Sequence, residues 1–298
     1  LKTCFYTEEG VARAVDDVSL ILREGEILGL VGESGCGKST LGKAILQLDK
    51  ATSGSIRYRG KELNQLDSKE IRHMRKEIQL IFQDPFASLN PQMQLMDQVS
   101  EPMRNYNIAS GSELQDRVAS LFDRVHLPRS FMRRFPHEMS GGQRQRIGIA
   151  RALATNPDFI VADEPISALD VSIQAQVLNL LQDLQEELGL TYLFIAHDLS
   201  VVRHVSDRVA VMYLGKIVKT SSVRDVIDSP AHPYTRGLLN ALPRLDDLDA
   251  PLMEGGSDDT AIFWHALPPL EHAPALPKGV KALSDVVDAP GASVVVDG

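Results

Sequence analysis

The sequence predicts an α/β fold built on a largely parallel sheet, and three observations support this prediction. Short apolar segments of strand character alternate with amphipathic helical segments along the chain. A glycine-rich loop stands between the first of those strands and the helix that follows it. The 298 residues are 43% hydrophobic and 24% charged, which is enough apolar surface for a substantial core.

The expected elements follow from the hydrophobic periodicity. Three short apolar runs predict buried parallel strands, at residues 26–32, 158–163 and 191–197. Two segments predict helices, at residues 38–48 and 172–189, and the second ends at Gly189. Strand character also appears at residues 54–63, with an exposed turn, and at 207–220, which predicts a hairpin turned at Leu214-Gly215-Lys216.

Two regions depart from that alternation. Residues from about 84 to 154 are mostly helical in pattern and predict a separate helical subdomain. After residue 243 the composition shifts to Pro, Ala, Gly and Asp, and residues 244–298 hold ten acidic and three basic residues, a net charge of −7 out of −9 for the chain. We therefore expect one folded domain over residues 1–243 and a weakly folded acidic tail over 244–298.

Composition excludes several classes of protein. No segment approaches the roughly 18 consecutive apolar residues of a membrane helix, and the N-terminus has no apolar signal-peptide core. The two cysteines, Cys4 and Cys36, argue against a disulfide framework and fit the cytosol. The net charge argues against a broad nucleic-acid surface. The chain begins at Leu1 in a strand-like segment, which suggests a trimmed N-terminus or a piece of a longer polypeptide.

The strongest motif is GESGCGKST, which fits the phosphate-loop pattern G-x-x-x-x-G-K-[ST] between a strand and a helix. Its glycines let backbone N–H groups turn toward phosphate oxygens, and the helix N-terminus favours negative charge. We expect nucleotide contacts from the whole loop: Gly32, Glu33, Ser34, Gly35, Cys36, Gly37, Lys38, Ser39 and Thr40. Within it, Lys38 is expected to reach the β- and γ-phosphates and Ser39 to bind Mg²⁺. For Cys36, a small residue filling the loop is a simpler interpretation than an oxidation sensor.

An acidic pair, Asp163-Glu164, ends the apolar run FIVADEP. A strand that ends in Asp beside a phosphate loop can hold Mg²⁺, commonly through water. The next carboxylate, Glu164, can polarise the attacking water as a general base. The alternative is an ordinary strand end with a solvated acidic turn, but the upstream phosphate loop favours the functional interpretation.

A second glycine turn, MSGGQ, precedes a helical run and supplies N–H donors that could face a phosphate. Together with GESGCGKST, Gln83, FIVADE, SALD and His197, in that order along residues 1–243, it resembles the nucleotide-binding subunits of ABC transporters. The resemblance implies a P-loop ATPase domain with a RecA-like core, an antiparallel β subdomain and a helical subdomain. It also implies a head-to-tail dimer, in which the signature residues of one domain complete the ATP site of the other: Ser140, Gly141, Gly142 and Gln143.

The same resemblance assigns further residues. Gln83 corresponds to the residue that contacts Mg²⁺ and water and hinges the helical subdomain. Asp170 ends the SALD loop, which crosses the dimer interface, and His197 corresponds to the switch histidine that contacts the γ-phosphate. Phe5 is the better match to the aromatic residue that stacks on adenine, with Tyr6 next; both also fit a core role.

FQDPFASLNP and SPAHPYTRGLLNALP resemble the oligopeptide/dipeptide importer branch, in particular its second ATPase. The resemblance implies ATP and Mg²⁺ as cofactors, a sister ATPase or a second copy as dimer partner, two membrane permeases, a substrate-binding protein and a place at the cytoplasmic face of the membrane. The cargo stays open among peptides, nickel and glutathione. Met139 stands where Leu is usual, Ile166 where Val or Thr is usual, and two cysteines are too few for a Cys₄ iron–sulfur cluster.

Other functions fit less well. Soluble ABC ATPases of DNA repair or translation carry long coiled coils or two ATPase modules, whereas here 107 residues without a heptad run lie between Gly32 and Ser140. A fused tandem transporter ATPase stays open because of the Leu1 start. A non-hydrolysing regulator is disfavoured by Glu164 and His197. His265 and His272 in the tail are expected to be solvated or lightly packed rather than metal-binding.

Overall fold

The computed structural model describes residues 1–7, 10–230, 232–240 and 292–297. A six-stranded sheet lies at its centre, made of β4 (Ile27–Val31), β7 (Ile78–Ile81), β8 (Phe159–Asp163), β9 (Thr191–Ala196), β10 (Arg208–Tyr213) and β11 (Lys216–Ser222). The strand order is β11-β10-β4-β9-β8-β7, in which all neighbours are parallel except the edge strand β11. The predicted parallel α/β sheet is therefore confirmed.

The central strands are buried on both faces. In β4, Ile27 and Val31 belong to one hydrophobic cluster, whereas Leu28 and Leu30 belong to the other, because successive side chains of a strand point to opposite faces. The first cluster includes residues of helices α3 (Leu95–Asn105), α4 (Gly111–Arg124), α5 (Gly141–Leu153), α6 (Val171–Leu188) and α7 (Leu199–Val205). The second cluster is formed with α1 (Lys38–Ile45) and the antiparallel strands. Burial of the sheet between two layers explains why the sequences of its central strands are continuous apolar runs.

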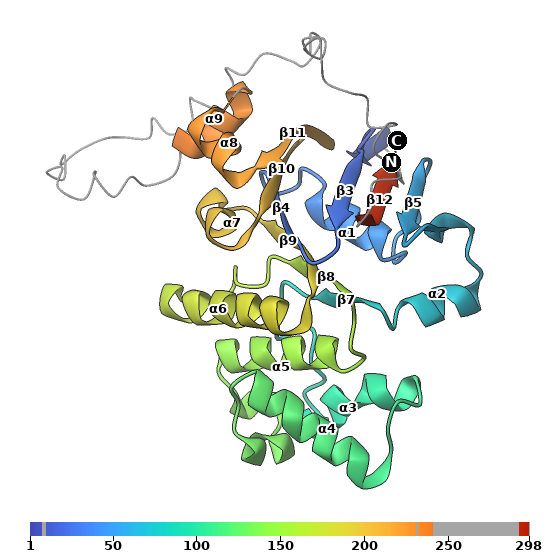
Figure 1. Ribbon diagram of the computed structural model, residues 1–298, viewed down its shortest axis with the longest axis vertical. Helices are drawn as coiled ribbons and strands as arrows, with labels where there is room; N and C mark the ends of the chain where they lie inside the picture. The colour runs from blue at the N-terminus through green and yellow to red at the C-terminus, as the bar shows by residue number, and fades with distance from the viewer. Residues whose placement is uncertain (8–9, 231, 241–291, 298) are drawn as a thin grey trace, which may run out of the picture.

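The antiparallel strands form two small sheets beside the central one (Figure 1). One is the hairpin of β1 (Thr3–Thr7) and β2 (Gly10–Val15). The other has the order β3-β12-β5-β6, from β3 (Leu20–Arg23), β12 (Ala292–Asp297), β5 (Ser55–Tyr58) and β6 (Lys61–Glu62). These sheets correspond to the antiparallel subdomain that the family resemblance implied.

Strand β12 corrects part of the expectation for the tail. Residues 244–298 were expected to be weakly folded, yet residues 292–297 pair with β3 on one side and β5 on the other. Val294 and Val296 are fully buried there, so a run of three β-branched residues finds the packed, two-sided environment it favours. The other residues of the tail, including His265 and His272, and the expected boundary at residue 243 lie outside the described residues.

The helical region expected at residues 84–154 contains α3, α4 and α5, joined by short 3₁₀ turns at Arg129–Arg133 and Pro136–Glu138. A further 3₁₀ turn at Leu63–Gln65 and helix α2 (Ser68–Met74) precede β7. Helices α8 (Val223–Asp228) and α9 (Pro233–Asn240) lie beside β10 and β11 (Figure 1). The hairpin turn is confirmed at Leu214-Gly215, both with positive φ, and α6 ends at Gly189 in the left-handed region.

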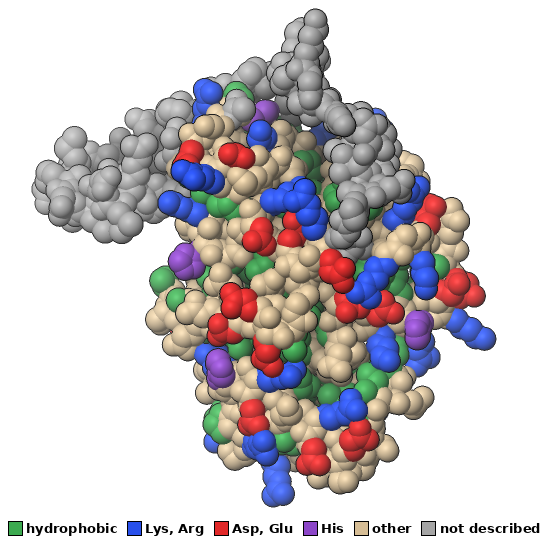
Figure 2. Space-filling view, in the orientation of Figure 1, with side chains coloured by type: hydrophobic (Ala, Val, Ile, Leu, Met, Phe, Trp, Pro, Cys, Tyr) green, Lys and Arg blue, Asp and Glu red, His purple; other side chains and the backbone are tan. Residues whose placement is uncertain are grey.

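Within the described part of the chain, no helix combines the length and apolarity needed to cross a bilayer. On the face drawn in Figure 2, basic and acidic side chains are interspersed over the described surface.

Candidate active site

The phosphate loop connects the end of β4 to the start of α1, and the helix begins at Lys38. Two of its glycines pass so close to backbone that no side chain would fit. A Cβ on Gly32 would lie 2.2 Å from the Met212 carbonyl oxygen, and a Cβ on Gly37 would lie 1.9 Å from that of Ala14. Gly37, with φ 110°, also turns the chain into the helix. The motif therefore has the strand–loop–helix setting that phosphate binding requires.

Lys38 is buried, with 4% of its surface exposed. Its Nζ donates to the carbonyl oxygens of Gly32, at 2.7 Å, and Glu33, at 2.8 Å. The ammonium is thus held across the loop by neutral acceptors. Phosphate oxygens are stronger acceptors for a cation than carbonyls, so an incoming phosphate can compete for it.

Cys36 is also buried in the loop, and its Sγ lies 3.9 Å from the Lys38 Nζ. Burial raises the pKa of the thiol, and the lysine charge only partly opposes this effect. A protonated, buried thiol is a poor target for oxidation, which favours the space-filling interpretation of Cys36.

Ser39 and Asp163 form the expected oxygen pair. The Ser39 hydroxyl donates to the Asp163 carboxylate at 2.9 Å, which joins the start of α1 to the end of β8. Burial raises the pKa of Asp163, while the hydrogen bond from Ser39 works in the opposite direction. A hydroxyl and a buried carboxylate next to a phosphate loop are hard oxygen donors that suit Mg²⁺.

Glu164 is held in an unusual backbone conformation. Its φ is 45°, in the left-handed region, a conformation that costs about 1–3 kcal/mol for a residue with a side chain. The N–H of Glu164 donates to the Ile195 carbonyl at 3.0 Å, which fixes this turn against β9. This left-handed turn comes directly after Asp163, the last residue of β8.

The structure brings three predicted residues together at the Glu164 carboxylate. The Gln83 side-chain amide donates to Oε2 at 2.8 Å, and the His197 Nδ1 lies 3.6 Å from the same oxygen. These residues follow β7, β8 and β9, three neighbouring parallel strands whose carboxyl ends meet at one edge. A carboxylate, an amide and an imidazole beside a phosphate loop form an arrangement that can orient a water molecule for phosphoryl transfer.

The signature turn is built as a capping box at the start of α5. The Ser140 hydroxyl accepts from the Gln143 N–H, and the Gln143 side chain accepts from the Ser140 N–H. A Cβ on Gly142 would lie 2.3 Å from the Ile173 Cγ2, and one on Gly141 would lie 3.4 Å from Leu169. The signature turn therefore packs closely against the segment around Asp170, the residue that precedes α6.

Ser140 itself is exposed at the surface. Among the described residues, no hydrogen bond or ion pair links the signature turn to the phosphate loop of the same chain. Just before the turn, Met139 is buried with 4% of its surface exposed, where a methionine fills the volume of a leucine.

Phe5 and Tyr6 lie on β1 and are 44% and 77% exposed, so neither is a core residue. Their hairpin adjoins the phosphate loop, because the Ala14 carbonyl in β2 is the atom that a side chain at Gly37 would meet. An exposed aromatic residue at this border is available to stack on a base.

One contact to the phosphate loop was not predicted. The Glu33 N–H donates to the Tyr234 hydroxyl at 2.8 Å, across 201 residues of sequence. Tyr234 lies in the HPYT segment, residues 232–235, whose pattern predicted the family branch but no contact with the loop.

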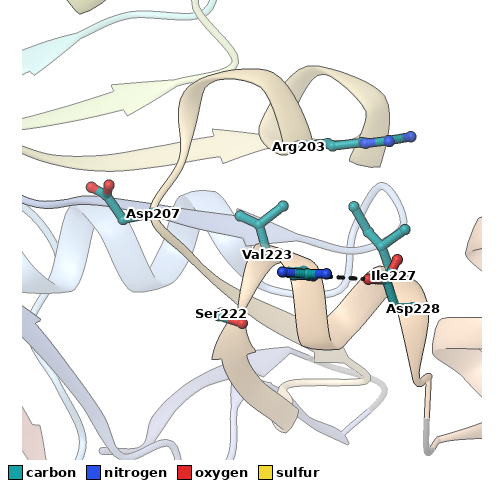
Figure 3. A pocket seen from close by; sticks show the side chains of 7 residues that line it. Arg203, Asp207, Ser222, Val223, Ile227 and Asp228 are labelled. Carbon is teal, nitrogen blue, oxygen red and sulfur yellow. Dashed lines mark hydrogen bonds and ion pairs between the residues drawn. The ribbon is translucent and has the colours of Figure 1, made fainter.

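A hollow of about 480 Å³ lies between α7 and α8 (Figure 3). Arg224 forms an ion pair with Asp228 at 3.4 Å on its wall, and Arg203 and Asp207 add one charge of each sign. None of its lining residues belongs to the phosphate loop or to the group of Gln83, Glu164 and His197.

Comparison with known families gives two matches. The model of the ABC transporter family matches residues 15–167. A second model, the C-terminal region of oligopeptide/dipeptide transporters, matches residues 218–259, which include Tyr234.

Curated relatives carry names of the same kind. The chain is 55% identical to the oligopeptide transport ATP-binding protein AppF of Bacillus subtilis over 240 residues, 80% of this chain and 73% of the relative. It is 54% identical to the oligopeptide transport ATP-binding protein OppF of Escherichia coli K12 over 243 residues, 81% and 73% of the two chains.

Among solved structures, the chain is similar to an ATP-binding cassette captured as a dimer in a post-hydrolysis state with ADP and Pi. The TM-score is 0.69 at 32% identity, over 75% of this chain and 97% of that one. It is also similar to cbiO1 from Clostridium perfringens, part of an ABC transporter complex, with a TM-score of 0.68 at 27% identity over 82% and 95% of the two chains.

Proposed function

Because the chain belongs to the ABC transporter family of ATP-binding proteins and to its oligopeptide transport branch, we propose that it binds and hydrolyses ATP to power the uptake of peptides through partner permeases. The observation that carries the proposal is the meeting of Gln83, Glu164 and His197 at one carboxylate oxygen, next to a complete phosphate loop. That geometry combines a phosphate cradle with a water-orienting group, which ATP hydrolysis requires.

In this proposal each residue has a distinct task. The N–H groups of the loop and Lys38 hold the β- and γ-phosphates, and the Lys38 charge offsets negative charge that develops during transfer. Ser39 and Asp163 would hold Mg²⁺, assisted by Gln83; when bound, the ion neutralises phosphate charge. Glu164 accepts a proton from the attacking water, and His197 contacts the γ-phosphate.

The signature turn is proposed to act on a second protein chain. Ser140 and the following glycines begin a helix whose free N–H groups and positive dipole end suit a phosphate. The exposure of Ser140 and its lack of a described bond to its own phosphate loop support a role in a head-to-tail dimer. The solved cassette with ADP and Pi is itself dimeric. Asp170 would lie at that interface, and Phe5 would stack on adenine.

The partners follow from the same family membership. We propose a sister ATPase or a second copy of this chain, two membrane permeases, and an indirect connection to a substrate-binding protein. The subunit would then work peripherally, at the cytoplasmic face of the membrane. Peptides are the proposed cargo, in line with the names of its relatives.

The proposal is tested with Glu164→Gln, which keeps the side-chain volume and removes the base. The variant should bind ATP, form the dimer and hydrolyse ATP at least about a hundredfold more slowly than the wild type. Glu187→Gln is the matched control, because Glu187 is an exposed residue in the last turn of α6 and its ion pair is with Arg124 at the end of α4, which is not a residue of the site. Wild-type turnover in Glu164→Gln would refute the assigned base, and a wild type that binds no ATP would refute the function.

A further inference from the structure

The phosphate loop is held from outside by the strand pair β10–β11. The Gly215 N–H, in the hairpin turn, donates to the Cys36 carbonyl at 2.9 Å. The backbone at Met212 closes on Gly32, where an added Cβ would lie 2.2 Å from the Met212 carbonyl oxygen. These contacts fix the first and middle parts of the loop, and they leave Glu33 between them.

Both backbone polar groups of Glu33 form hydrogen bonds. Its carbonyl accepts from the Lys38 Nζ at 2.8 Å, and its N–H donates to the Tyr234 hydroxyl at 2.8 Å. The Lys38 contact competes with nucleotide, since the same ammonium is the group that binds phosphates. The Tyr234 contact does not compete, so it can hold the loop while ATP is bound.

Tyr234 is itself rigidly placed. It is 3% exposed, and its ring packs on the ring of Tyr213, the last residue of β10, with centroids 4.3 Å apart. Its N–H donates to the His232 Nδ1, which fixes the start of α9. The Arg236 side chain closes the same turn by donating to the Pro230 carbonyl at 2.8 Å. The hydroxyl is therefore presented to the loop by a fixed scaffold and not by a mobile side chain.

From this geometry we propose that Tyr234 is a positioning residue for ATP: it holds the N–H of Glu33 so that the phosphate loop is preorganised, and the HPYT segment thereby sets nucleotide affinity. The inference rests on the proposed ATPase function, and it gives the C-terminal region of this branch a task at the ATP site. Burial raises the pKa of Tyr234 well above its ordinary value, so the hydroxyl stays protonated at neutral pH.

The test compares Tyr234→Phe with Tyr192→Phe in the full chain. Both remove a hydroxyl from a buried tyrosine, but the Tyr192 hydroxyl has no partner among the described residues, and Tyr192 pairs with Ile27 at the end of β4 opposite to the loop. Calorimetric titration with ATP and Mg²⁺ should give about fivefold to tenfold weaker binding for Tyr234→Phe, because the partly buried N–H of Glu33 loses its acceptor and the loop is less preorganised. Tyr192→Phe should bind as the wild type does.

A purely structural role would give a different pattern. Partial unfolding of Tyr234→Phe would lower the number of binding sites and kcat at unchanged KM, whereas a positioning role raises the KM for ATP with little change in kcat. If the wild type binds ATP and Tyr234→Phe has the same affinity and KM, the role of Tyr234 is overturned while the ATPase assignment stands. A wild type without ATP binding would overturn the ATPase assignment and this inference with it.

Discussion

The close contact between the signature turn and α6 predicts the effect of one added methyl group. In Gly142→Ala the new Cβ would lie 2.3 Å from the Ile173 Cγ2, whereas the Ile173 Cβ is 3.7 Å away, an ordinary contact. Ile173 is β-branched and stiff at χ1, so the overlap must be relieved by moving a helix. Overpacking of this kind costs about 1–3 kcal/mol, and the better helix propensity of alanine returns at most about 1 kcal/mol.

The sign of the effect should reverse when the colliding atom is removed. We expect Ile173→Ala alone to cost about 1–2 kcal/mol, since the side chain is only partly buried. The double variant Gly142→Ala/Ile173→Ala should be as stable as Ile173→Ala, or slightly more so, because the Cγ2 atom is gone. Gly148→Ala in the same helix is the matched control, since nothing lies within 4 Å of the position that its Cβ would take, and it should be neutral or stabilising.

The assay is urea unfolding of the wild type, the two single variants at positions 142 and 173 and their double variant, read as a double-mutant cycle, with Gly148→Ala measured as the control. A coupling free energy of about 1–3 kcal/mol between the two positions is expected. ATP-driven dimerisation should fall in Gly142→Ala as well, because the helix start that carries Ser140 moves with it. Additive effects, or a Gly142→Ala variant as stable as the wild type, would show that the turn is not packed as described.

Two further predictions concern the C-terminal elements. Burial lowers the pKa of His232 below 6.5, and its neutral Nδ1 accepts the Tyr234 N–H. The stability that this contact contributes is therefore present above about pH 6.5, and it is lost as the pH falls through the lowered pKa. Unfolding free energies measured against pH should therefore fall faster on acidification for the wild type than for His232→Asn, which keeps an acceptor without titrating; parallel profiles would refute the assignment. Val296→Asp places a carboxylate in a fully buried position of β12 and should lower the free energy of unfolding by more than about 3 kcal/mol. The control Val11→Asp, at a 55% exposed position, should lower it far less. Equal losses in the two variants would argue against the packing of β12.

Much of the fold is readable from sequence because the central strands are buried on both faces. Continuous apolar runs such as residues 27–31 and 159–162, each followed by a loop and a helix, are typical of buried parallel strands. The strand β12 is different, because its partners β3 and β5 lie more than 200 residues away in the chain. A short Val-rich run at the end of an acidic, Pro-rich segment carries no local sign of such pairing, so composition alone suggested a loose tail.

The same distinction holds for the site. The positions of Lys38, Ser39, Asp163 and Glu164 at the start of α1 and the end of β8 could be anticipated, because each has a fixed offset within a local motif, while their roles stay a proposal. The contact of Tyr234 with Glu33 could not, since it depends on where α9 packs and not on any spacing. The left-handed φ of Glu164 was also unpredictable, because residues that precede a proline usually adopt extended conformations.

The central claim, an ATP site shared between two chains, is tested most directly by a structure of the Glu164→Gln variant with ATP and Mg²⁺, alone or with its sister ATPase. The account predicts that Ser140 of one chain lies within hydrogen-bonding distance of the γ-phosphate of an ATP held by the phosphate loop of the other. A structure in which every ATP contacts a single chain, with Ser140 facing solvent in every assembly, would contradict it.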